Sequence, residues 1–187
     1  PLFALRKESN GKDFKDILKA IENYTGEFDI SYTDTLRYVL SELMYNAIEH
    51  GPSFSSTTNI NLPALVQMSW YRNKGEMNFI IADLGIGIKS HIEQTYPGQE
   101  SNEAAIRLAL QPEKSGTFAN SDPYNAKNNA GMGLYLSSNI IRRLQGDMYI
   151  LSNDGLVHIS PRDVTSKTLE SQWKGTIAFL SIKIGKE

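Results

Sequence analysis

Two apolar runs in the middle of the chain constrain its fold more than any other feature. Residues Leu65 to Tyr71 and Met77 to Ala82 have the composition of β-strands, and the turn residues Asn73-Lys74-Gly75 lie between them. This arrangement predicts an antiparallel hairpin, with Asp83 at the end of its second strand. The chain shows helices and hairpins, without the alternation of strand and helix that builds a parallel sheet. We therefore expect an α+β fold.

Helical spacing of apolar residues marks two segments before this hairpin. It predicts one helix from Asp13 to Tyr24 and a second from Thr33 to His50, which Gly51-Pro52 ends. The apolar side of the second helix consists of Leu36, Val39, Leu40, Leu43 and Ala47. Residues 1–30 are interpreted as an N-terminal helical segment.

The chain after the hairpin begins with a long polar stretch. Residues Ile88 to Ala130 are rich in Asn, Ser, Gly and Pro, apart from a short helix expected near Glu103 to Leu110. A polar excursion of this length inside a compact domain predicts a functional lid.

The last third of the chain returns to regular structure. A helix is predicted from Met132 to Gln145, closed by Gly146. Strands are predicted at Met148 to Ser152, Val157 to Ser160 and Thr176 to Ile184, with a loop from Pro161 to Lys174.

Length and composition narrow the class of protein. The 187 residues fit a single domain spanning 1–187, and the formal net charge of -2 gives no reason to expect a nucleic-acid partner. The chain has no cysteine, which excludes disulfides and thiolate chemistry and favours a cytoplasmic location. No apolar run approaches the roughly 18 residues of a membrane span, so no membrane contact is expected.

Glu42 and Asn46 are the first pair of polar residues that suggest a binding site. They lie four residues apart on the second predicted helix, so they share a face at the border of its apolar side. A ligand held there would be partly shielded from water. The same spacing also occurs in ordinary surface pairs, so the pair alone does not identify a site.

Two glycine-containing turns supply the remaining candidates. Asp83-Leu84-Gly85-Ile86-Gly87 follows the second strand of the hairpin, where glycines allow backbone to approach a ligand closely. Gly131-Met132-Gly133-Leu134 opens a helix, whose free N–H groups bind phosphate oxygens. Each string is also common without a ligand.

The order of these motifs is more specific than any of them alone. From Thr33 to Ile184 the chain resembles the GHKL superfamily of ATP-binding domains, which includes gyrase, the large heat-shock chaperone, histidine kinases and the mismatch-repair ATPase. It is most similar to the histidine kinases and the serine kinases that act as anti-sigma factors. The resemblance implies a two-layer Bergerat-type sandwich, with helices covering one face of a mixed, mostly antiparallel sheet. Residues 88–130 would be its ATP lid.

The resemblance also implies roles for individual residues. Asn46 would hold Mg²⁺ and Glu42 would act as the general base. Asp83 would accept a hydrogen bond from the adenine amine, which favours ATP over GTP. Residues of the glycine turns and the late strand would line the nucleotide: Gly85, Gly87, Gly131, Met132, Gly133, Leu134 and Thr176. Lys127 of the lid is a candidate contact for the γ-phosphate.

Three functions remain open at this point. The domain is expected to bind Mg-ATP and pass the γ-phosphate to a protein, as a histidine or serine kinase does. Alternatively, it hydrolyses ATP as a conformational switch, or it only senses the nucleotide and regulates a partner. The expected partners are an adenine nucleotide and a protein acceptor or regulated partner, and a homodimer is left open.

Overall fold

The computed structural model describes residues 1–25, 30–51, 53–55, 60–115 and 131–183. Its elements follow the chain in this order: β1 (Leu2–Leu5), η1 (Lys7–Ser9), α1 (Lys12–Thr25), α2 (Ile30–His50), β2 (Ser53–Ser55), β3 (Ile60–Leu62), β4 (Ala64–Tyr71), η2 (Arg72–Lys74), β5 (Glu76–Ala82), α3 (Gly87–Ile92), α4 (Asn102–Ala109), α5 (Gly133–Arg143), β6 (Asp147–Ile159) and β7 (Val164–Lys183).

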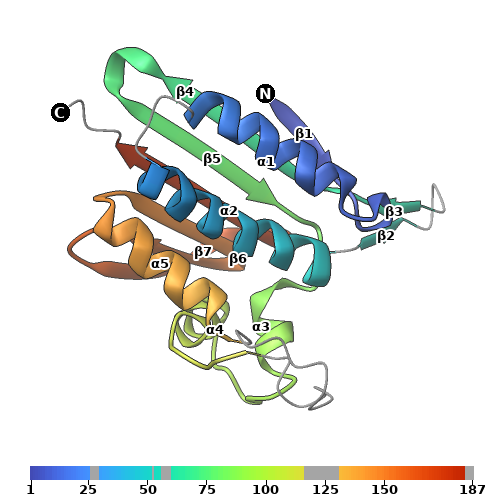
Figure 1. Cartoon of the computed structure of the whole chain (residues 1–187). Helices are drawn as coiled ribbons and strands as arrows, with labels where there is room; N and C mark the ends of the chain where they lie inside the picture. The colour runs from blue at the N-terminus through green and yellow to red at the C-terminus, as the bar shows by residue number, and fades with distance from the viewer. Residues whose placement is uncertain (26–29, 52, 56–59, 116–130, 184–187) are drawn as a thin grey trace.

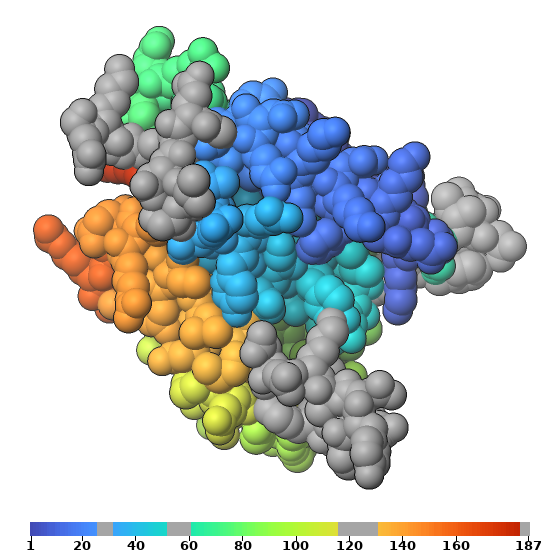
Figure 2. All heavy atoms as spheres, in the orientation of Figure 1, coloured from blue at the N-terminus to red at the C-terminus, as the bar shows by residue number. Residues whose placement is uncertain are grey.

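Five strands form one sheet in the order β1-β4-β5-β7-β6, and each neighbouring pair is antiparallel. Helices α1, α2 and α5 lie across one face of this sheet (Figure 1). In Figure 2 their side chains form a continuous layer over the sheet. This arrangement confirms the predicted α+β sandwich of two layers.

The core lies between this helical layer and the sheet. The predicted apolar side of α2 is buried, with exposures of at most 5% for Leu36, Val39, Leu40, Leu43 and Ala47. Opposite it, β5 alternates buried and less buried residues, with Met77, Phe79 and Ile81 pointing inward. Apolar residues recur every 3.6 residues on the helix and every second residue on the strand, so each element has one apolar face. These two faces pack against each other. The predicted hairpin of β4 and β5 and the predicted helices are confirmed, with small shifts of their ends.

Two expectations about the sheet are wrong. Residues 1–30 are not wholly helical, because Leu2–Leu5 form the edge strand β1 against β4. The two strands predicted from Met148 to Ser160 are one strand, β6, interrupted by a bulge at Asn153, and the predicted loop at 161–174 is mostly β7. This part of β7 is polar and largely exposed. Its sequence therefore shows no alternation of apolar and polar residues, although the segment pairs with β6.

The described part of the predicted lid is largely regular. Helices α3 and α4 occupy its first half, and α4 confirms the short helix expected near Glu103 to Leu110. Ile92, Ala105 and Ile106 are buried, which fixes both helices to the body of the domain. Residues 116–130 lie outside the described residues, so the lid itself stays a prediction.

Candidate functional site

Asp83 directly follows β5, next to the end of α2. Its main-chain N–H donates to the Thr176 carbonyl at 2.8 Å. Its Oδ1 accepts hydrogen bonds from the main-chain N–H of Gly85 at 2.8 Å and of Thr176 at 3.2 Å. Among the described residues Oδ2 has no hydrogen-bond partner. One carboxylate oxygen therefore holds the loop in place, and the other is left for a ligand.

The electrostatic environment of Asp83 favours a hydrogen bond from outside. Burial raises the pKa of its carboxyl above the ordinary value, and the two N–H donors of Gly85 and Thr176 oppose part of this rise. A partly desolvated carboxylate gains more from an additional donor than an exposed one does, because water competes less.

An irregular stretch of β7 brings the strand against Asp83. Ser152 and Asn153 of β6 pair with Thr176 and Trp173, so Lys174 and Gly175 form an insertion in β7. Gly175 has φ +105, and a Cβ there would lie 2.8 Å from Asp83 Oδ1. The Trp173 Nε1–H donates to the Asp83 carbonyl at 2.9 Å. Only glycine combines this conformation with so close an approach.

Ser152 lies under this loop and was not predicted from the sequence. Its side chain is fully buried and accepts a hydrogen bond from the Ile88 N–H at 2.8 Å. Its Oγ also lies 3.2 Å from the Gly175 carbonyl and 3.4 Å from Thr176 Oγ1. Ser152 thus links the start of α3 to the strand that holds Asp83. The only sequence signal for it is a serine at a core position of a strand.

Glu42 lies against the beginning of α5. A Cβ added to Gly133 would be 3.3 Å from Glu42 Cδ and would collide with Oε2. The negative charge of Glu42, after burial, contributes to raising the pKa of Tyr38, one turn earlier on α2. The structure therefore places the predicted general base beside the predicted phosphate-binding turn, two positions more than 90 residues apart in the chain.

Asn46 follows Glu42 by one helical turn and is half-buried. Its side-chain amide makes no hydrogen bond with the described residues. An unpaired amide on the α2 face that carries Glu42 is open to a ligand.

The glycine turn before α5 has the conformation of a helix start. Gly131 has φ +79, and Met132 is the N-cap but provides no side-chain cap. The first turn, with Gly133 and Leu134, contains no acidic residue. Its N–H groups and the positive end of the helix dipole are therefore suited to an anion. Lys127 lies outside the described residues.

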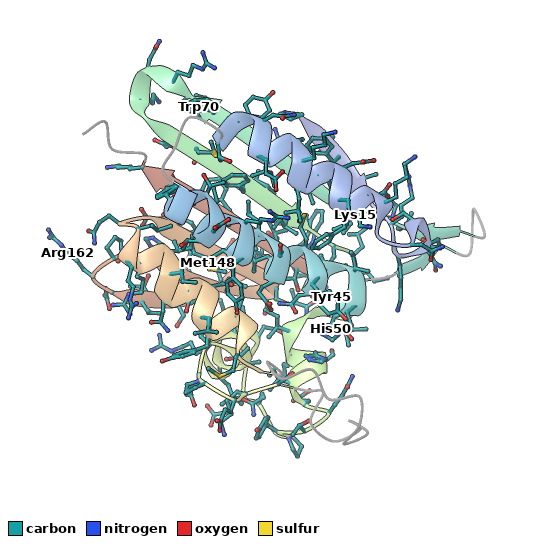
Figure 3. All side chains as sticks on the ribbon, viewed as in Figure 1. Lys15, Tyr45, His50, Trp70, Met148 and Arg162 are labelled. Carbon is teal, nitrogen blue, oxygen red and sulfur yellow. The ribbon has the colours of Figure 1, made fainter. Side chains whose placement is uncertain are left out.

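Two histidines meet at the end of α2. The rings of His50 and His91 have centroids 4.0 Å apart, and Figure 3 labels His50 beside α3. Burial, followed by the neighbouring His50, lowers the pKa of His91 to about 4. His91 is therefore neutral at pH 7 and adds no positive charge for a phosphate.

Three features define a nucleotide-binding domain of the two-layer type. They are the acceptor at Asp83, the polar face of α2 and the helix that begins with a glycine turn. Residues 31–183 match the family model described as histidine kinase-, DNA gyrase B-, and HSP90-like ATPase. The chain therefore belongs to this family of ATP-binding domains, which confirms the resemblance seen in the sequence. No curated protein matches the chain. None of the described helices is long and apolar enough to cross a membrane.

Proposed function

We propose that this domain binds Mg-ATP and transfers the γ-phosphate to a protein acceptor. The observation that carries the proposal is the position of Glu42 at the start of α5, where a base can reach a group attacking the terminal phosphate. The segment Asn46-Ala47-Ile48-Glu49-His50-Gly51 also resembles that of the kinases in the family.

The proposed binding mode assigns one part of ATP to each region. Asp83 Oδ2 accepts the adenine amine, with Gly85, Gly87 and Thr176 beside the base. The N–H groups from Gly131 to Leu134 bind phosphate oxygens. No group of three metal-binding carboxylate or histidine side chains occurs in the described part of the chain. This fits Mg²⁺ held by the Asn46 amide oxygen together with phosphates and water, where it would neutralise phosphate charge.

The acceptor is proposed to lie on another protein. All three histidines of the chain already make contacts: His50 with His91, and His158 with Asp147 at 2.7 Å. His158 also stacks on Tyr149. Each histidine therefore already has a neighbour within the domain.

The test is incubation with γ-labelled ATP and Mg²⁺, alone and with candidate partner proteins. We expect label on a partner protein, because the proposed base acts on an acceptor hydroxyl or imidazole. Free phosphate without labelled protein would instead indicate an ATP-hydrolysing switch. Binding of ATP with neither product would indicate a nucleotide-sensing module.

Asn46→Ala is expected to weaken Mg-ATP binding by about tenfold or more, because the metal loses its protein ligand. Calorimetric titration with and without Mg²⁺ measures this effect. Binding in EDTA should differ little between the variant and the wild type. Equal loss of affinity with and without the metal would contradict the assignment of Asn46 to Mg²⁺.

A further inference from the structure

A cavity of about 310 Å³ lies between α4, α5 and the adjoining ends of β6 and β7. Its α5 wall consists of Tyr135, Ser138, Asn139 and Arg142, which recur at helical spacing and so share one face. None of the residues assigned to the nucleotide lines the cavity. Helix α5 therefore begins at the nucleotide site but presents a separate face to this second space.

Two arginines and no carboxylate line the cavity. Arg107 comes from α4 and Arg142 from α5. Arg107 Nη1 lies 3.4 Å from the Val164 carbonyl and from Ser166 Oγ, and Arg142 Nη2 lies 3.5 Å from the Pro161 carbonyl. These distances exceed the usual 2.7–3.2 Å of a good N–H···O bond. Each guanidinium has five N–H donors, so the described residues use only a small part of this capacity.

The Arg142 side chain is incompletely paired by the described residues. Its Nε atom is buried, and it has no hydrogen-bond partner in the described structure. Buried N–H groups are nearly always paired with protein, water or a ligand. Because this atom is covered by protein, a ligand in the cavity would meet the other donors of the Arg142 guanidinium.

The other groups in the cavity define the kind of acceptor. The Ser138 hydroxyl and the Asn139 amide both donate to the Tyr135 carbonyl, at 2.8 and 3.0 Å, which uses the hydroxyl donor and one of the two amide donors. Leu110, Ile159 and Val164 add an apolar surface. Two guanidinium groups beside apolar side chains suit an anion with a short carbon skeleton, because guanidinium pairs bidentately with carboxylate and phosphate.

We propose that this cavity is a second binding site, which takes a small organic anion bearing a carboxylate or phosphate group. Arg142 binds the anion through its guanidinium group, and Arg107 contacts it from α4. The volume is at the lower end of the roughly 300–1,000 Å³ of small-molecule sites, which limits the ligand to metabolite size. This proposal does not depend on phosphate transfer by the nucleotide site.

The experiment follows the Arg142 Nε–Hε signal by NMR in the full chain saturated with ADP and Mg²⁺. Succinate and glycerol phosphate are titrated at constant ionic strength, with succinamide and glycerol as neutral matches. We expect a saturable shift of this signal with at least one anion, and comparison of the two anions separates carboxylate from phosphate. Arg142→Gln identifies the signal by its loss. The dissociation constant of this variant, followed by the backbone amide signals of α5, should be about tenfold higher or more.

Arg143→Gln is the matched control, since Arg143 is the next residue on α5 and is exposed. It should bind the anion like the wild type. If Arg142→Gln does not fold, Arg107→Gln provides the same comparison from the exposed side of the cavity. Retained affinity in both cavity variants overturns the proposal, as does a saturable shift with succinamide or glycerol equal to that with the anions. The absence of any saturable shift up to about 10 mM anion also overturns it.

Discussion

Glu42→Gln is expected to lower phosphate transfer or release about 100-fold or more while the affinity for Mg-ATP stays near that of the wild type. The amide keeps the shape of the side chain beside Gly133 but cannot take a proton. A general base acts only as the reaction proceeds, so its loss appears in turnover. Labelled ATP measures turnover, and calorimetry measures affinity.

Glu22→Gln is the matched control for this substitution. Glu22 is a glutamate of the same helical layer, on α1, and forms a 2.8 Å ion pair with Arg37 at the surface. Its replacement should leave turnover unchanged, since exposed pairs contribute little. Turnover of Glu42→Gln at the wild-type rate would show that Glu42 is not the base. A large loss of ATP affinity would instead assign it to binding.

Asp83→Asn is expected to weaken ATP binding by about 1 to 3 kcal/mol, roughly 5- to 150-fold. The amide oxygen can still accept the N–H groups of Gly85 and Thr176, which now bind Oδ1. The amide NH₂ then takes the place of Oδ2 and faces the amine of adenine, so two donors oppose each other. Calorimetric titration with ATP measures the loss.

The same variant should have the opposite effect on the affinity for GTP. Guanine presents a carbonyl oxygen where adenine has its amine, so the introduced NH₂ gains an acceptor. The ratio of GTP to ATP affinity should therefore rise in Asp83→Asn, whereas Asp83→Ala should lose ATP affinity without this rise. Equal affinity of the wild type for ATP and GTP, or unchanged ATP binding in both variants, would remove Asp83 from the base site.

Much of the candidate site was predictable because its parts are local motifs. The helix carrying Glu42 and Asn46, the strand ending at Asp83 and the glycine turn before α5 each leave a pattern within a few residues. Trp173 and Ser152 leave no such pattern. Their importance arises from the insertion in β7 opposite Ser152 and Asn153, and a shift of register between two paired strands has no signature in either strand alone.

The sequence by itself determined the α+β class, the helices α1, α2 and α5, the β4–β5 hairpin and the family, because apolar periodicity and motif order are properties of contiguous residues. It could not determine that Val164–Lys183 is one long strand, since the polar part of β7 is held by its partner β6 and not by burial of its own side chains. Tertiary structure alone brought Glu42 to Gly133 and joined Arg107 and Arg142 around one cavity. Such contacts depend on how α2, α4 and α5 pack on the sheet, and that packing is decided by the whole core at once.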